Sequence, residues 1–302
     1  MKLKKHTIWI ALIIILTVII LVYVTSKHTS SYQVINGKLF YSSYKGDALF
    51  ARTIFNQTSI VQTDKISFVS RPFLNRSVTI YALLFMPAQH TKPLPAVIFL
   101  PGAGVTKEAT SAISTRIALQ GYAVLVLDQR GIGQTGGTIP SIEQDYAFFK
   151  QGYEPMQHLW VFDALKAFDI LQHIPEVDKT KIAIMGESMG GRYALIAAAL
   201  EPQLKGAILI SSAGYNIPLQ SEDPAHLFLK SIDPDTYASM ISPRPLYMMH
   251  GDKDTVIPIS SAQHTFFLAQ EPKEFFTAEG CAHGLCTQME PVLYTYLQKL
   301  FA

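Results

Sequence analysis

Apolar and polar positions follow two different patterns along this chain, and each pattern predicts a kind of β-strand. Residues 65–70 and 77–86 alternate apolar with polar side chains, which is typical of a half-exposed β-hairpin. Continuous apolar runs indicate strands that helices cover on both faces, and they lie at residues 96–100, 123–127, 182–185, 207–210, 245–249 and 274–276. We therefore expect a sheet that begins antiparallel and continues with buried strands.

Segments with helical patterns lie between and after these runs. They span residues 111–120, 161–171, 189–200 and 291–301. Strands that alternate with helices predict an α/β fold with a mostly parallel central sheet, helices on both faces and functional groups at the carboxyl ends of the strands. We assign this domain to residues 64–302. We expect residues 29–63 to be a polar linker followed by a loosely structured lead-in.

The N-terminal segment, residues 1–28, has a different composition. Lys2, Lys4 and Lys5 precede residues 8–24, a run of 17 uncharged residues rich in Ile, Leu and Val. As a helix this run would be about 25 Å long, near the lower limit for crossing a hydrocarbon core of about 30 Å. We predict a transmembrane helix that anchors the protein, with a cleaved signal peptide as the alternative. The lysines favour a cytoplasmic N-terminus, so the domain would face outward, or be secreted after cleavage.

A candidate nucleophile lies in the stretch GESMG, residues 186–190, between the apolar run 182–185 and the helical segment that follows. A serine on such a strand-to-helix turn projects its hydroxyl away from the backbone. Gly186 and Gly190 allow the strand and the helix to approach closely around it. The pattern therefore predicts that Ser188 is a nucleophile.

A serine hydroxyl needs a base, and the base needs a carboxylate to hold its tautomer. Asp254 follows the predicted strand 245–249, and His283 follows the predicted strand 274–276. The order serine, acid, histidine along the chain is that of α/β-hydrolases. We therefore expect the tertiary structure to bring Asp254 and His283 to Ser188.

Five motifs together carry a resemblance to a known superfamily. They are LPGAG at 100–104, DQRGIGQTGG at 128–137, GESMGG at 186–191, HGDKDTVIP at 250–258 and GCAHG at 280–284. The chain resembles the serine hydrolases of the α/β-hydrolase superfamily, and most closely its dienelactone-hydrolase and prolyl-oligopeptidase-like esterases. This resemblance covers about residues 64–302 and implies the α/β-hydrolase fold.

The resemblance also bears on the acid. Asp252 lies two residues before Asp254 and is the alternative, but the motif implies that the second aspartate is catalytic. We expect His250 to end a strand, with its ring packed or bonded to backbone.

For the oxyanion hole, the resemblance implies the backbone N–H groups of Met189 and Ala103, with Gly104 as the next candidate. Relatives often have His-Gly where this chain has Pro101-Gly102. A side chain that often buttresses the loop is therefore missing here.

Residues 131–136, GIGQTG, also match a dinucleotide-binding fingerprint. Three residues separate the strand from the first glycine, Pro140 interrupts the expected helix, and no strand with an acidic end follows. We therefore predict no cofactor. We expect a structural loop in which Arg130 pairs with a carboxylate or backbone carbonyls.

Two other segments, residues 134–157 and 214–240, are long enough to cover a site as a roof.

Cys281 and Cys286 are the two cysteines of the chain, and they bracket His283. We expect two thiols packed in a loop. A disulfide that stiffens the histidine loop is the alternative, which an outward-facing domain would permit. Two cysteines and one histidine at this spacing lack a fourth ligand, so we predict no metal.

Charge and motifs together lead to a predicted function. With 25 basic and 23 acidic residues, the balance gives no reason to expect nucleic-acid binding. We predict a hydrolase that cleaves small-molecule carboxylic esters through an acyl-enzyme on Ser188. The alternatives are a peptidase of prolyl-oligopeptidase type, a thioesterase or acyltransferase, and a catalytically silent binding protein.

Overall fold

The computed structural model describes residues 32–42, 48–218 and 223–302. The predicted transmembrane run 8–24 lies outside these residues. Within the described ranges, no helix combines the length and the apolar composition that crossing a bilayer requires.

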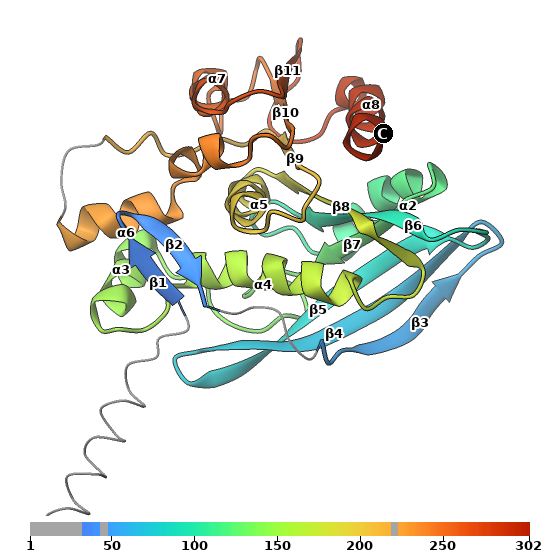
Figure 1. The fold of residues 1–302 in the computed structure, drawn as a ribbon, viewed down its shortest axis with the longest axis horizontal. Helices are drawn as coiled ribbons and strands as arrows, with labels where there is room; N and C mark the ends of the chain where they lie inside the picture. The colour runs from blue at the N-terminus through green and yellow to red at the C-terminus, as the bar shows by residue number, and fades with distance from the viewer. Residues whose placement is uncertain (1–31, 43–47, 219–222) are drawn as a thin grey trace, which may run out of the picture.

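A nine-stranded sheet organises the molecule (Figure 1), with strand order β11-β10-β9-β8-β6-β7-β5-β4-β3. Strands β6 to β11 run parallel to one another, and β3, β4 and β5 form the antiparallel part. The strands are β3 (Ala51–Gln57), β4 (Val61–Phe73), β5 (Arg76–Pro87), β6 (Leu94–Leu100), β7 (Ala123–Leu127), β8 (Val177–Glu187), β9 (Ala207–Ile210), β10 (Leu246–Gly251) and β11 (Lys273–Ala278). The mostly parallel α/β sheet predicted from the alternation of strands and helices is confirmed.

Helices cover both faces of the sheet, and Figure 1 shows α4 crossing one of them. They are α2 (Ser111–Leu119), α3 (Ile142–Lys150), α4 (Met156–Leu171), α5 (Met189–Leu200), α6 (Pro224–Ile232), α7 (Ile259–Leu268) and α8 (Glu290–Phe301). Alternate residues of β6 enter different cores: Ile98 packs with side chains of α4 and α5, whereas Phe99 packs with side chains of α2 and α8. This explains why the buried strands read as continuous apolar runs.

The stretch before residue 64 is more ordered than we expected. It contains a two-stranded hairpin, β1 (Tyr32–Ile35) and β2 (Lys38–Tyr41), and it contains β3, which pairs with β4. The Tyr41 hydroxyl donates to the His158 carbonyl at 2.6 Å, which ties the hairpin to α4. The expectation of a loose lead-in was wrong because β1 and β2 are too short to show a period and β3 is an exposed edge strand.

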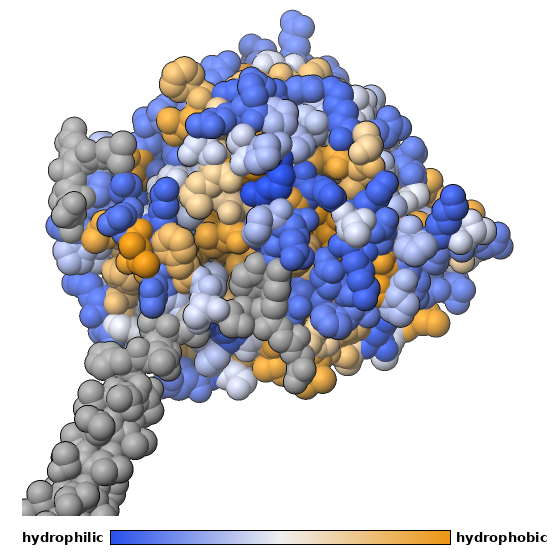
Figure 2. Space-filling view, viewed as in Figure 1, coloured by the Kyte–Doolittle hydropathy of each residue, from blue (hydrophilic) through white to orange (hydrophobic). Residues whose placement is uncertain are grey.

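The two long segments after β7 and β9 carry α3 and α6, which pack against each other. The Phe149 and Phe228 rings lie 5.4 Å apart between centroids, and the Tyr146 ring lies 5.5 Å from that of Phe228. Apolar side chains gather on the surface over α6 and the β1–β2 hairpin (Figure 2), where Ile35 is 48% exposed and Phe40 is 41% exposed.

A buried ionic network joins the β4–β5 side of the sheet to α4. The Arg130 Nε lies 2.6 Å from Asp163 Oδ2, and its Nη1 donates to the Arg71 carbonyl at 2.8 Å. The predicted pairing of Arg130 with a carboxylate and with backbone is therefore confirmed. Arg71 in turn pairs with Glu154 at 2.7 Å.

Glu154 should make stability depend on pH. Burial raises the pKa of Glu154 to about 7, and the charge of Arg71 only partly offsets this. The stability that the neutral carboxyl contributes is complete below its ordinary pKa and is lost as the pH rises through about 7. Urea unfolding of wild type and Glu154→Gln at several pH values should therefore show wild type losing stability relative to the variant from about pH 5 to about pH 8. A constant difference would contradict this prediction.

Candidate active site

The turn between β8 and α5 holds Ser188 in a conformation that few residues adopt. Its backbone has φ 52° and ψ −120°, between the last residue of β8 and the first of α5. A side chain on Gly186 would collide with the Gly190 backbone, and one on Gly190 would collide with the Leu100 carbonyl. Only glycine therefore fits on either side of the turn, and the strain fixes where the serine hydroxyl points.

The structure brings Ser188, His283 and Asp254 together. The Ser188 Oγ lies 2.9 Å from His283 Nε2, and His283 Nδ1 lies 2.7 Å from Asp254 Oδ2. In sequence, Ser188 lies 95 positions from His283, and Asp254 lies 29 positions from it. Each of the three residues follows the carboxyl end of a parallel strand. This arrangement can remove the proton of the serine hydroxyl and stabilise the imidazolium that forms.

Asp254 is held as an anion by its surroundings. Its Oδ1 accepts the backbone N–H groups of Val256 and Ile257, each at 2.9 Å. Burial would raise the pKa of Asp254, but these donors and His283 outweigh burial and hold it below its usual value. Asp252 instead accepts the Gly280 N–H at 2.6 Å, so the structure places Asp254, rather than Asp252, against the histidine.

The two oxyanion donors stay predictions, and they lie at the start of α5 and in the loop after β6. Met189 is the first residue of α5, so its N–H has no acceptor within the helix. Ala103 lies inside a turn that Val105 N closes on the Gly102 carbonyl at 3.2 Å, and this bond does not use the Ala103 N–H. Gly102 packs against the Ser188 side chain, which brings the loop beside the nucleophile.

Sequence reasoning missed Gln129, which supports this loop. Its side-chain amide donates to the Pro101 carbonyl, and the same carbonyl packs against Gly190. Gln129 is buried and supplies the buttress that we expected to be absent beside Pro101-Gly102. Its place two residues past the end of β7, at the same sheet edge as Ser188, is the signal that would have found it.

Sequence reasoning also missed Ser211 and Ser212, which directly follow β9. The Ser212 hydroxyl donates to the Ser188 carbonyl at 2.8 Å, and the Ser211 hydroxyl accepts the Gly284 N–H at 3.0 Å. They tie the nucleophile turn and the histidine loop to the neighbouring strand. Two serines after a buried strand at this edge were the available signal.

Cys281 and Cys286 form a disulfide with a Cα–Cα distance of 6.3 Å. The expectation of two packed thiols was therefore wrong. A separation of five residues allows either state, and the chain reversal around His283 brings the two side chains together.

This bridge should stabilise the histidine loop. In the chain-entropy model, closing such a short loop contributes about 2 kcal/mol. The double variant Cys281→Ala, Cys286→Ala should therefore unfold at lower urea concentration and turn over ester a few-fold more slowly. Wild type treated with dithiothreitol should show the same loss of stability and turnover as the double variant, whereas the double variant should not respond to the reductant. A variant as stable and active as wild type would refute this role.

The glycine-rich loop 131–136 packs around a carboxylate of the same chain, that of Asp128. Asp128 is fully buried, its Oδ2 lies 2.6 Å from Lys107 Nζ, and the same oxygen accepts the Gln134 N–H at 2.8 Å. A side chain on Gly133 would collide with the Asp128 carboxylate. The loop therefore binds a carboxylate of the protein itself, which agrees with its interpretation as structural.

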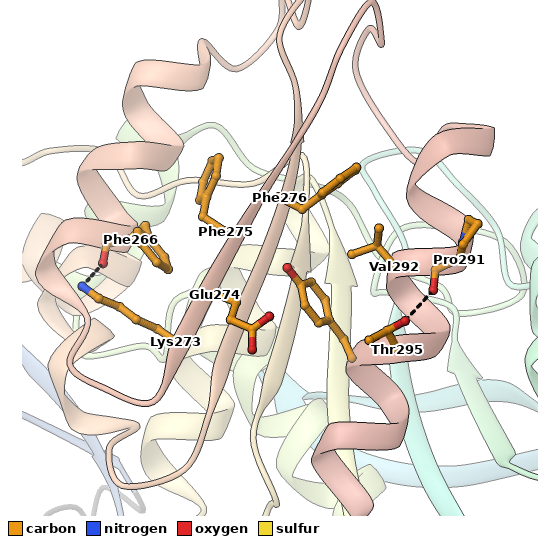
Figure 3. A pocket seen from close by; sticks show the side chains of 9 residues that line it. Phe266, Lys273, Glu274, Phe275, Phe276, Pro291, Val292 and Thr295 are labelled. Atoms are coloured by element: carbon orange, nitrogen blue, oxygen red, sulfur yellow. Dashed lines mark hydrogen bonds between the residues drawn. The ribbon is translucent and has the colours of Figure 1, made fainter.

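A hollow at the β11 edge of the sheet is separate from the triad. It measures about 600 Å³ and lies between α7, β11 and α8, lined by Phe266, Phe275, Phe276, Val292 and Tyr296 among others (Figure 3). Lys273 crosses its rim and donates to the Phe266 carbonyl at 2.8 Å. None of the triad side chains lines it.

Comparison with known proteins identifies the family. A model described as "Dienelactone hydrolase family" matches residues 80–296, from within β5 to within α8 and including Ser188, Asp254 and His283. This chain belongs to the dienelactone hydrolase family. The resemblance drawn from its five motifs is confirmed. Its fold is the α/β-hydrolase fold.

Relatives of this dienelactone hydrolase family member are distant. It is 27% identical over 157 residues to the uncharacterized protein YfhR of Escherichia coli O157:H7, covering 50% of each chain. It is 25% identical over 253 residues to acetyl esterase Axe7A of Xylanibacter ruminicola, covering 74% of this chain and 57% of that protein. The chain thus spans about half the length of the curated relatives it matches.

Solved structures support the fold. Acetyl xylan esterase 1 from Thermoanaerobacterium superposes with a TM-score of 0.69 at 18% sequence identity, over 85% of this chain and 89% of that chain.

Proposed function

We propose that this protein hydrolyses carboxylic esters of small molecules through an acyl-enzyme formed on Ser188. The observation that carries the proposal is the continuous hydrogen-bond chain from Ser188 Oγ through His283 to Asp254, with distances of 2.9 and 2.7 Å. A serine on a strained turn with this partner set has the geometry that acyl transfer requires. The names of relatives such as an acetyl esterase point to the same reaction class.

The proposed reaction has two halves. Ser188 Oγ forms a bond to the acyl carbon while His283 Nε2 takes the hydroxyl proton, and the carbonyl oxygen becomes an oxyanion. Collapse of this intermediate breaks the bond to the alkoxide, which receives the proton from His283. Water then attacks the acyl-enzyme, with His283 again as base, and releases the acid and the serine hydroxyl.

The protein supplies electrostatic stabilisation to both halves. Asp254 accepts a hydrogen bond from the Nδ1–H of His283 and stabilises the imidazolium. The N–H groups of Met189 and Ala103 donate to the oxyanion, and the Gln129–Pro101 bond holds the loop that carries Ala103.

The test is labelling combined with turnover. A fluorophosphonate probe should modify folded wild type, peptide mass analysis should locate the adduct on Ser188, and p-nitrophenyl esters of graded acyl length should be hydrolysed. Labelling before the assay should lower the rate of hydrolysis in proportion to the fraction of protein that carries the adduct. Folded protein that neither reacts nor hydrolyses any ester of the panel would favour the catalytically silent binding protein.

We also propose that residues 8–24 anchor the protein in a membrane with the hydrolase domain facing outward. The uncharged run and the three preceding lysines support this orientation. Protease added to intact cells should digest the domain, and N-terminal analysis should find the segment retained. Protection of the domain would refute the orientation, and loss of the segment would favour secretion after cleavage.

A further inference from the structure

The segment that carries the predicted donor Ala103 has an exposed middle and buried ends. This oxyanion loop, residues 101–107, joins β6 to the short helix η1 (Glu108–Thr110). Ala103 and Gly104 are exposed, and a Cβ on Gly104 would meet no atom of the described residues within 4 Å beyond its chain neighbours. Packing therefore does not hold the middle of the loop, so the bonds at its two ends decide where the Ala103 N–H points.

Lys107 holds the last end of the oxyanion loop. Its side chain is completely buried, its backbone N–H donates to Asp128 Oδ1 at 2.8 Å, and its Nζ donates to Asp128 Oδ2 at 2.6 Å. Nζ also lies 2.8 Å from Glu108 Oε1. One buried carboxylate therefore binds both the backbone and the side chain of Lys107.

The first end of the loop is held by the residue next to Asp128. The Gln129 side-chain amide donates to the Pro101 carbonyl, so two consecutive residues bind both ends of the oxyanion loop. Asp128 and Gln129 directly follow β7, and β7 pairs with β6, the strand from which the loop leaves. The register of these two strands therefore fixes the loop relative to the residues that hold it.

A buried ion pair such as that of Lys107 and Asp128 needs a reason other than stability. Removing two charges from water costs about as much as their attraction returns, and an apolar pair of similar volume often serves the fold equally well. An apolar pair, however, makes no directed bonds to the loop backbone. We propose that Lys107 and Asp128 are positioning residues, which together with Gln129 hold the oxyanion loop so that the Ala103 N–H meets the oxyanion. This role rests on the proposed ester hydrolysis.

Two variants release the loop from one end each without leaving a buried charge unpaired. Lys107→Met combined with Asp128→Leu replaces the ion pair by apolar side chains, and Gln129→Met removes the donor to Pro101. Each variant should lower kcat for p-nitrophenyl acetate about 10- to 100-fold with little change in KM, because a donor misplaced by about 1 Å loses most of its effect on the oxyanion.

A thionoester substrate separates the oxyanion donors from the triad. In p-nitrophenyl thionoacetate a sulfur atom replaces the carbonyl oxygen, and sulfur accepts hydrogen bonds only weakly. Both variants should therefore lower kcat/KM for the thionoester only a few-fold, so the preference for ester over thionoester should fall. Damage to the triad would lower both rates alike, since attack by Ser188 and proton transfer by His283 serve both substrates.

The matched control removes a charged pair that lies away from the loop. Lys166 Nζ lies 2.6 Å from Asp169 Oδ2 within α4, and Lys166→Met combined with Asp169→Leu should keep both rates and the ester preference. An unchanged preference in Gln129→Met, or equal falls on the two substrates, would overturn the proposal. Gln129→Met changes no charge, so it decides the question if the double variant at 107 and 128 does not fold.

Fluorophosphonate labelling of wild type separates this inference from the proposed function. Labelled, active wild type whose ester preference persists in the loop variants would reject only the positioning role. Folded wild type that neither reacts with the probe nor hydrolyses an ester would reject the proposed function, and this inference with it.

Discussion

Replacing Ser188 by alanine should lower kcat for p-nitrophenyl acetate by about 10⁴-fold or more, because no acyl-enzyme can form and only water remains as nucleophile. The turn should persist in the variant. Its geometry depends on the glycines around it and on backbone bonds such as Ser188 N to the Ile210 carbonyl at 2.9 Å, which alanine retains. Steady-state kinetics should therefore show the fall in kcat, while thermal unfolding should show that the variant unfolds at about the temperature of wild type.

Ser260→Ala is the control for this measurement, since Ser260 is an exposed serine on α7 and its loss should leave kcat unchanged. Fluorophosphonate labelling should vanish in Ser188→Ala and persist in Ser260→Ala. If Ser188→Ala kept a tenth of the wild-type turnover, another group would have to be the nucleophile.

Asparagine at position 254 should reduce kcat by about 10³- to 10⁴-fold. Asp254 fixes the tautomer of His283 through the 2.7 Å bond to Nδ1 and stabilises the imidazolium with its charge. The uncharged amide removes that stabilisation and can turn an N–H toward Nδ1, which selects the wrong tautomer. KM should change little, because the carboxylate lies behind the histidine and does not touch substrate.

Asp252→Asn is the matched control, two residues away in the same loop. Asp252 holds the turn at Gly280, and the amide oxygen of asparagine can still accept that N–H. Its kcat should stay within a few-fold of wild type. Equal losses in the two variants would mean that the loop as a whole, rather than the charge at 254, supports turnover.

The fold and the triad could be predicted because their signals are local. Ser188 stands out through an apolar run, two glycines and a helical segment that adjoin one another in sequence. Asp254 and His283 follow apolar runs, and parallel strands bring their carboxyl ends to one edge wherever they lie in the sheet. Errors arose where the local signal was absent, as in the short hairpin of β1 and β2.

By itself, the amino-acid sequence determined the α/β class, the strands that helices cover on both faces, and the order serine, acid, histidine. Tertiary structure decided which strands are neighbours: β6 pairs with both β7 and β8, and this carries Gln129 to Pro101 and Gly102 to Ser188. It also joined Cys281 to Cys286 and set His250 against Asp254. The physical reason is that periodicity and turn chemistry act over a few residues, whereas these contacts depend on strand order and loop closure across the whole chain.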